Sequence, residues 1–242
     1  MKPWAYSAGR ALLDFVYPRS CCDCGEEITG SIENGLCWDC RTQTLGLSPP
    51  WCERCGMGVA GRVDHAFVCS DCHEHPPVYE RGRSLYHYEG GVRTAIHALK
   101  YHRDFSVIPD LSRLLLAGLR AHFPNEEACV LVAVPLHPRR QRKRGFNQGV
   151  ELIKGMQKLD HSLERWKGLQ RIKDTETQTR LSKAARRENV RSAFSVKDTG
   201  EVPQKVYLID DVMTTGATLD ACARALRKAG VVEVNTLTLA RG

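Results

Sequence analysis

The chain of 242 residues lacks any run of apolar residues that reaches the roughly 18 needed to cross a membrane. We therefore expect no transmembrane segment. Met1–Val16 also lacks the apolar core of a secretory signal, because Ser7, Arg10 and Asp14 interrupt it. Without a signal for secretion, we expect a cytoplasmic protein. A P-loop nucleotide site is excluded, since the pattern G-x-x-x-x-G-K-[ST] does not occur.

Cysteine, in contrast, is frequent and regularly spaced. Eight of the 11 cysteines form four C-x-x-C pairs, which repeat after about 31 residues. The pairs are Cys21 with Cys24, Cys37 with Cys40, Cys52 with Cys55, and Cys69 with Cys72. Gly25 and Gly56 follow the leading pair of each repeat and can supply the positive φ of a tight metal-binding turn. The spacing predicts two zinc ribbons, each with one structural Zn²⁺ and four thiolate ligands.

Three alternatives accompany this prediction. The cysteines can form a disulfide framework instead, but that requires an oxidising compartment. Each Zn²⁺ can take its ligands from consecutive pairs or from a crossed arrangement of pairs. The ribbons can be structural, because a segment this short cannot bury a sufficient core without metal. They can also contact nucleic acid through Trp38, Trp51 and Arg54; we favour the structural role.

The segment Val206–Thr218 carries the clearest chemistry. An apolar run ends in Asp210 and Asp211, a hydroxyl-rich turn follows, and an amphipathic helical pattern comes next. This order predicts a strand, an anion-binding loop and a helix N-terminus, whose backbone N–H groups favour a phosphate. The predicted phosphate contacts are Thr214, Thr215, Gly216, Ala217 and Thr218. Because the two carboxylates can accept hydrogen bonds from a sugar diol, the segment predicts a site for a ribose 5-phosphate.

This segment resembles the phosphoribosyl pyrophosphate (PRPP) motif of type I phosphoribosyltransferases. The resemblance implies that Asp210 and Asp211 are the catalytic carboxylates that contact the ribose hydroxyls. It also implies Mg²⁺ between the pyrophosphate and ribose oxygens, and since Mg²⁺ keeps most of its water, we expect few protein ligands. The alternative is the buried strand of any doubly wound domain, with aspartate at its tip and threonine as a helix cap.

A basic segment follows a second apolar strand, predicted over Cys129–Pro135. Positions 137–144 hold five Lys or Arg residues. A basic loop at the carboxyl end of a parallel strand is where α/β sheets bind anions, and the resemblance implies that this loop holds pyrophosphate. The residues assigned to it are Arg144, Gly145, Asn147 and Gln148. The alternatives are a solvated patch or a stripe for DNA, to which Arg139 and Arg140 would contribute.

A polar stretch, Lys173–Arg191, lies where type I phosphoribosyltransferases carry a flap over the reacting centre. Such flaps exclude water from a centre that hydrolyses readily. The flap residues that this comparison implies are Thr175, Gln178, Arg187 and Asn189. The alternative is an ordinary exposed helix with charge pairs.

Four motifs in this order resemble the ComF family, including its GntX branch. They are R-G-F-N-Q at 144–148, R-x-x-x-T-x-x-Q at 171–178, R-x-N at 187–189 and the PRPP segment. The resemblance implies a cytoplasmic bacterial protein linked to natural transformation or to the use of external DNA. Single-stranded DNA and DNA-uptake proteins would then be partners. Glutamine amidophosphoribosyltransferases are also similar, but they carry a nucleophilic cysteine where Lys2 follows Met1, so we do not expect ammonia transfer from glutamine.

We therefore expect two domains. Residues 1–80 would form a helix and a double zinc ribbon, and residues 81–242 a doubly wound α/β domain of the type I phosphoribosyltransferase type with a mainly parallel sheet. Two functions remain open. The chain can be a phosphoribosyltransferase with an unknown acceptor, or a non-catalytic protein that kept the fold as a nucleotide sensor or single-stranded-DNA-binding accessory protein.

Overall fold

A computed structural model describes residues 19–28, 35–59, 61, 63, 65–124, 129–174, 190, 192–197 and 200–242. The strands of its main sheet are β1 (Arg81–His87), β2 (Val130–Ala133), β3 (Glu164–Arg165), β6 (Lys205–Met213) and β7 (Glu233–Arg241). They are all parallel and lie in the order β1-β7-β6-β2-β3. A second sheet pairs β4 (Leu169–Arg171) with β5 (Phe194–Val196) in antiparallel fashion.

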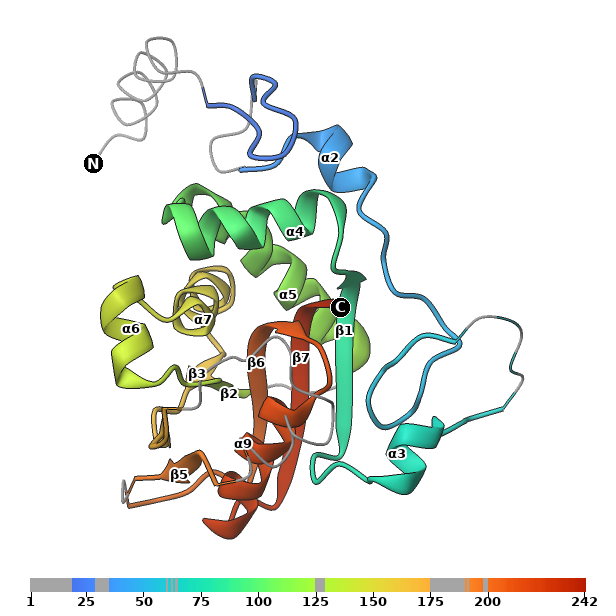
Figure 1. The fold of residues 1–242 in the computed structure, drawn as a ribbon, viewed down its shortest axis with the longest axis vertical. Helices are drawn as coiled ribbons and strands as arrows, with labels where there is room; N and C mark the ends of the chain where they lie inside the picture. Colours follow the sequence, from blue (N-terminus) through green and yellow to red (C-terminus); the bar gives the residue numbers. More distant parts are fainter. Residues whose placement is uncertain are drawn as a thin grey trace.

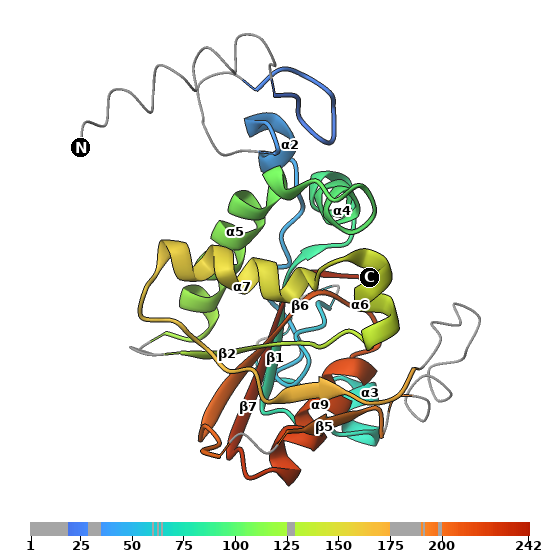
Figure 2. The same ribbon diagram turned by 90° about the vertical axis from the view of Figure 1, so that its left-hand side faces the viewer.

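Helices cover both faces of the main sheet. The described helices and helical turns are α2 (Trp38–Thr42), α3 (Ser70–Glu74), α4 (Gly90–His97), a π-helical turn (Ala98–His102), a 3-10 turn (Phe105–Val107), α5 (Ile108–His122), α6 (Pro138–Arg144), α7 (Gln148–Leu159) and α9 (Ala217–Lys228). Figure 2 shows α4, α5 and α7 on one side of the sheet and α9 on the other. Within the described ranges, none of the helices combines the length and the apolar character that crossing a membrane requires.

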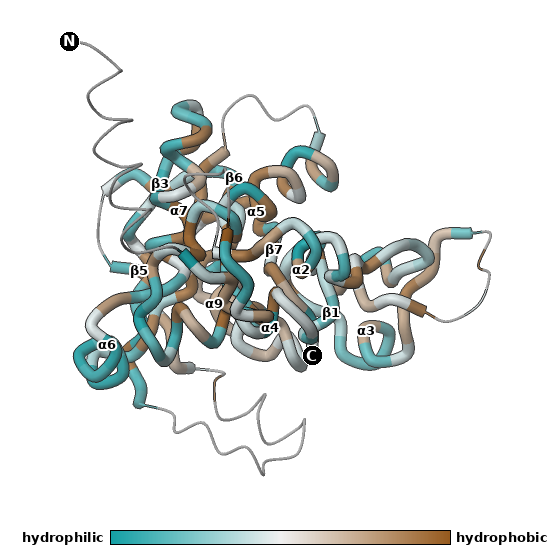
Figure 3. Tube along the Cα trace, turned by 90° about the horizontal axis from the view of Figure 1, so that it is seen from above, coloured by the Kyte–Doolittle hydropathy of each residue, from teal (hydrophilic) through white to brown (hydrophobic). Residues whose placement is uncertain are grey.

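The two faces follow from the alternation of side chains along each strand. On β6, Tyr207 and Ile209 enter a buried cluster with α4, α5 and α7, whereas Val206 and Leu208 enter a second cluster with α9. In Figure 3 the apolar stretches gather at the centre of the molecule and α6 is hydrophilic. The predicted doubly wound, mainly parallel sheet is confirmed.

Strand β7 is central to the sheet, although its sequence does not stand out. Seven of its nine residues are buried, but Asn235, Thr236 and Thr238 are among them. These polar side chains break the apolar run by which a buried strand is recognised. Part of their hydrogen bonding is met inside the sheet, where the Thr238 and Ser84 hydroxyls lie 2.7 Å apart.

The cysteine-rich segment covers the outer edge of β1, as Figure 1 shows. The backbone N–H of Leu47 donates to the carbonyl of Leu85 at 2.8 Å, and the N–H of Gly82 donates to the carbonyl of Arg54 at 2.6 Å. An uncovered edge strand presents unpaired N–H and C=O groups that promote aggregation. The cysteine-rich segment provides hydrogen-bond partners for some of these backbone groups of β1.

Helices α5 and α7 approach closely at Gly155. A Cβ atom built at Gly155 would lie 2.8 Å from Cβ of Ser112, which is fully buried on α5. Helix propensity alone favours alanine over glycine by about 1 kcal/mol. We expect packing to prevail, so that Gly155→Ala lowers the free energy of unfolding by about 1–3 kcal/mol.

Urea unfolding monitored by circular dichroism measures this change. Lys154→Ala, at the neighbouring exposed position of α7, is the matched control and should be neutral or stabilising. A Gly155→Ala protein as stable as wild type would show that α5 and α7 do not meet at this position.

Candidate functional site

A cavity of about 870 Å³ lies at the carboxyl ends of β2 and β6. The chain leaves β2 for α6 and α7 on one face of the sheet and leaves β6 for α9 on the other. Such a reversal is the place where open α/β sheets bind ligands. The residues that line the cavity are Tyr88, Lys100, Tyr101, Arg103, Val134, Pro135, Leu136, Arg140, Lys143, Arg144, Gln148, Arg171, Asp210, Asp211, Val212, Thr214 and Thr218.

The two aspartates are the sixth and seventh of the nine residues of β6, and strand geometry sends their side chains to opposite sides of the strand. The carboxylate of Asp211 forms an ion pair with the ammonium group of Lys100, whose side chain is 15% exposed. Lys100 is part of the π-helical turn that follows α4, a local irregularity that is frequent at functional sites. The carboxylate of Asp210 accepts a hydrogen bond from the backbone N–H of Asp211 at 2.9 Å.

The environment separates the protonation behaviour of the two carboxyl groups. Burial and the negative charge of Asp211 raise the pKa of Asp210 well above its ordinary value. Burial also opposes ionisation of Asp211, but the ammonium group of Lys100 outweighs it and lowers the pKa of Asp211. One carboxyl group of the pair therefore holds the charge and the other favours its proton.

The loop after β6 presents residues to two sides. Thr214 and Thr218 line the main cavity, whereas Thr215, Gly216 and Ala217 line a smaller cavity of about 320 Å³ on the other side of the loop. Gly216 is the N-cap of α9 with a φ of 76°, a backbone conformation that favours glycine. The strand, loop and helix predicted from the sequence are therefore present, and the assignment of these residues to a phosphate stays a prediction.

The basic segment at 137–144 is a helix, which corrects the expectation of a loop. Pro138 occupies the first turn of α6, and the side chain of His137 accepts a hydrogen bond from the N–H of Arg139 at 3.4 Å. Gly145 ends the helix with a φ of 90°. Proline at the start and glycine after the end are typical helix signals. Both signals are present in the sequence, but the high density of charged residues led to the interpretation of this segment as a loop.

The residues predicted to bind pyrophosphate divide into two groups. Arg144 and Gln148 line the cavity and are hydrogen-bonded to each other. Asn147 is buried and serves the backbone: its amide donates to the carbonyl of Val134 at 3.0 Å, and its oxygen accepts from the N–H of Val150 at 3.3 Å. Gly145 forms the turn between α6 and α7. Two of the four therefore face the cavity and two shape the turn.

Cationic and aromatic residues from distant parts of the chain complete the cavity. Lys100, Tyr101, Arg103 and Arg171 were not singled out as ligand contacts from the sequence, although the run Lys100–Arg103 is visibly basic. Burial lowers the pKa of Arg171, and the nearby charge of Arg140 adds to this effect. An arginine nevertheless stays protonated at neutral pH, so these groups concentrate positive charge around the two carboxyl groups.

The four predicted flap residues, Thr175, Gln178, Arg187 and Asn189, lie outside the described residues. Their assignment to a flap stays a prediction.

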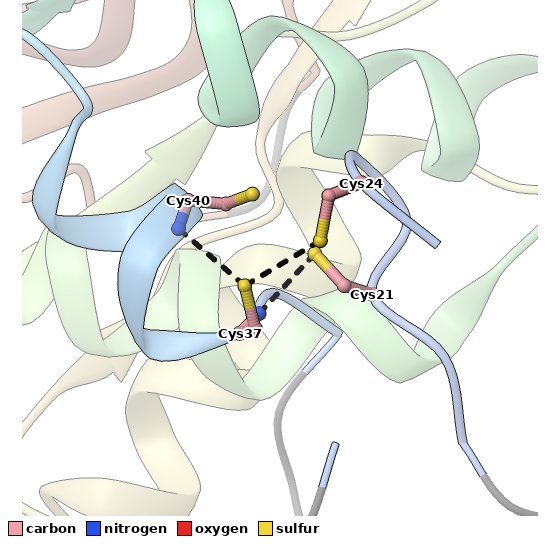
Figure 4. Close-up of side chains that lie close together, drawn as sticks. All are labelled: Cys21, Cys24, Cys37 and Cys40. Carbon is pink, nitrogen blue, oxygen red and sulfur yellow. Dashed lines mark hydrogen bonds between the residues drawn. The ribbon is translucent and has the colours of Figure 1, made fainter. Parts of the chain in front are cut away.

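The eight C-x-x-C cysteines form two groups from consecutive pairs. The first group is Cys21, Cys24, Cys37 and Cys40, and the second is Cys52, Cys55, Cys69 and Cys72. In each group the four sulfur atoms lie within 4.8 Å of one another. Figure 4 shows the first group with its side chains directed toward a common centre. Four thiol groups in this arrangement fit a structural Zn²⁺. The consecutive pairing is therefore the one present.

The two groups share the same local geometry. Gly25 and Gly56 have φ values of 79° and 68°, as the turn requires. The sulfur of Cys21 accepts from the N–H of Cys37 at 3.3 Å, and the sulfur of Cys52 accepts from the N–H of Cys69 at 3.4 Å. Burial opposes ionisation of both thiols, but these and other backbone N–H groups lower the pKa of Cys21 and of Cys52 to about 7. A thiolate is the form that binds metal.

The chain is similar to several known proteins. A family model described as a double zinc ribbon domain matches residues 12–73. Competence protein F of Haemophilus influenzae is 32% identical over 221 residues, which cover 86% of this chain and 91% of that protein. DNA utilization protein YhgH of Salmonella typhi is 32% identical over 231 residues, covering 86% and 97%. A hypoxanthine phosphoribosyltransferase from Staphylococcus aureus, of known structure, is 20% identical with a TM-score of 0.32, covering 55% and 62%.

The two cysteine groups generate a prediction about metal. We expect about two Zn²⁺ per chain by elemental analysis, since each group offers one tetrahedral set of sulfurs. A chelator should remove the ion of the first group sooner, because Cys24 is exposed whereas all four cysteines of the second group are buried. Colorimetric zinc release should therefore show two phases. Protein purified under reducing conditions that contains four disulfides and no zinc would contradict the prediction.

Proposed function

This chain belongs to the ComF family, and we propose that it binds PRPP or a related ribose phosphate as a phosphoribosyltransferase-like protein. The observation that carries the proposal is the cavity between β2 and β6. It combines a pair of carboxyl groups, a loop at a helix N-terminus and several cationic side chains. Each of these parts matches one group of PRPP by charge and hydrogen bonding: the ribose diol, the 5-phosphate and the pyrophosphate. Few other ligands carry all three groups.

The proposed pose follows from the chemistry of these parts. The 5-phosphate would lie at the loop Thr214–Thr218, where backbone N–H groups and the dipole of α9 favour an anion. The ribose diol would face Asp210 and Asp211. An ionised carboxylate accepts hydrogen bonds from hydroxyl groups, whereas a protonated carboxyl group can also donate one. One ionised and one protonated carboxyl group therefore suit a diol, whose hydroxyls both donate and accept.

The pyrophosphate would lie toward Arg144 and the cationic wall. A phosphoribosyl transfer breaks the bond between the sugar and pyrophosphate, so negative charge develops on the leaving group. Preorganised cations lower the energy of that state selectively. Mg²⁺ accompanying PRPP would screen the pyrophosphate charge, and it needs few protein ligands. Pyrophosphate release from PRPP in the presence of bases, amines and oligonucleotides distinguishes a transferase from a binding protein.

A role connected with DNA is the second part of the proposal. The two relatives bear names that refer to competence and to DNA utilization. Helix α6 supports the idea independently, because Arg139, Arg140, Arg142 and Lys143 are all exposed on it. Pyrophosphate needs only one or two of these charges. Exposed Phe105, whose ring centroid lies 5.0 Å from that of Phe146 just after α6, and exposed Tyr101 offer faces on which bases of a single strand can stack.

The carboxyl pair can be tested without disturbing the ion pair of Lys100. We expect Asp210→Ala to weaken PRPP binding by more than about tenfold, roughly 1.4 kcal/mol, with the fold intact, because alanine can neither donate to the ribose diol nor accept from it. Asp211→Asn alone would leave a buried ammonium group unpaired, which is strongly destabilising. It should therefore be combined with Lys100→Gln. Isothermal titration calorimetry measures the affinity, and thermal melting checks the fold.

Glu151→Ala, on α7 and outside the lining of the main cavity, is the matched control for the loss of one acidic side chain. It should leave PRPP affinity unchanged. If Asp210→Ala binds PRPP as tightly as wild type, Asp210 does not contact the ribose.

For DNA, the informative residues are Arg139 and Arg142, since neither lines the cavity. Replacing both by Gln should weaken binding of a single-stranded oligonucleotide and reduce the slope of log affinity against log salt. The reduction should be about 0.7 for each lost phosphate contact. PRPP binding should persist. Fluorescence anisotropy across a salt titration gives both quantities.

Lys154→Gln with Lys158→Gln removes the same charge from exposed positions of α7 and serves as the control. An unchanged affinity and slope in the Arg139 and Arg142 variant would exclude α6 as the DNA contact and direct attention to the zinc ribbons.

A further inference from the structure

Arg241, at the end of β7, connects the second cysteine group to the loop after β6. Its guanidinium donates to the backbone carbonyl of Cys55 at 2.8 Å and lies 3.7 Å from the sulfur of the same residue. The same guanidinium is 3.4 Å from the sulfur of Met213, the last residue of β6. One planar side chain therefore touches a metal-ligand residue and the strand end from which the loop departs.

Two further hydrogen bonds and one close approach surround the same region. The N–H of Gly242 donates to the carbonyl of Met213 at 3.1 Å, and the N–H of Val78 donates to the carboxylate of Asp220 on α9 at 2.7 Å. A Cβ atom built at Gly216 would lie 3.5 Å from the hydroxyl oxygen of Tyr79, which is itself buried beside Cys55 and Cys72. The loop is therefore held from behind by residues that pack on the second cysteine group.

The first cysteine group docks elsewhere. The backbone N–H groups of Gly35 and Leu36 donate to the buried carboxylate of Asp110 on α5 at 2.8 and 3.3 Å, and α2 packs against α4. Figure 1 shows α2 next to α4 and α3 on the far side of β1. The two cysteine groups are repeats in sequence but pack against different elements of the α/β domain.

We propose that Arg241 is a positioning residue that couples occupancy of the second zinc site to ribose-phosphate binding at the loop Thr214–Thr218. Hydrogen bonds to the thiolates and backbone of a metal knuckle orient the ligands, and the same guanidinium fixes Met213. Zn²⁺ at the second site then stabilises the loop conformation that the phosphate needs. By linkage, the phosphate must stabilise the bound zinc by the same factor. The inference rests on the proposed ribose-phosphate site.

A direct role of Arg241 as a phosphate ligand does not fit its position. Arg241 lines the smaller cavity behind the loop, together with Cys55, Thr215 and Gly216, and is absent from the lining of the main cavity. Its guanidinium would therefore affect phosphate binding indirectly, through its contacts with Cys55 and Met213.

The test uses the zinc-loaded protein and measures zinc release to a chelator with and without saturating PRPP. We expect PRPP to slow the release of one Zn²⁺ by about tenfold, within the usual range of coupling between sites, and to leave the other unaffected. In the Cys24→Ser protein, which lacks a complete first site, the protected ion should remain. Protection of both ions, of neither, or of the first alone would overturn the proposal.

Variants of Arg241 provide the second measurement. Arg241→Met should weaken PRPP binding by about tenfold and abolish the protection of zinc, with little change in melting temperature. Arg241→Lys keeps the charge but cannot contact both partners, so it should behave like Arg241→Met; wild-type behaviour of Arg241→Lys would exclude the bridging role. Arg227→Met, at the exposed end of α9, is the control. Failure of wild type to bind PRPP would refute the proposed function, whereas equal binding by wild type and Arg241→Met would refute this inference alone.

Discussion

The parallel pairing of β2 with β6 is the contact on which the candidate site depends. Its register, with Leu131 opposite Tyr207 and Ala133 opposite Ile209, brings the carboxyl ends of both strands to one edge of the sheet. Because the following helices go to opposite faces, a space remains between the two chain reversals. The carboxyl pair, the loop after β6 and helix α6 come together only at this edge.

The charge distribution of the site is unusual for a buried region. Arg144, Arg171 and Lys100 line the cavity together with the two carboxyl groups, and Lys100 forms an ion pair with Asp211. A buried ion pair contributes little net stability, because desolvation cancels most of the attraction. The proposed anionic ligand would balance the positive charge that these side chains bring to the cavity.

The cysteine groups belong to the architecture of the α/β domain as much as to their own segment. Between them, residues 45–47 pair with β1 and protect the edge of the sheet. The first group docks through Asp110 on α5, and the second packs behind the loop after β6. A ribbon that is too small to have its own core thus gains stability from metal and from the domain that it supports.

The sequence by itself determined the local units. The C-x-x-C spacing fixes the two cysteine groups, since four sulfurs so placed can close on one ion, and apolar runs followed by turns fix β2, β6 and α9. The resemblance of its motifs to type I phosphoribosyltransferases also implied the doubly wound class, which the structure confirms. The sequence did not reveal β7, because buried polar residues interrupt its apolar run. The helix signals of α6, Pro138 and Gly145, were present but were overlooked in a segment read as a basic loop. Only the tertiary structure decided that Lys100 pairs with Asp211 and that Arg241 reaches Cys55, a residue 186 positions away. Contacts of this kind depend on strand order and on the faces chosen by connecting helices, and local periodicity carries no information about either.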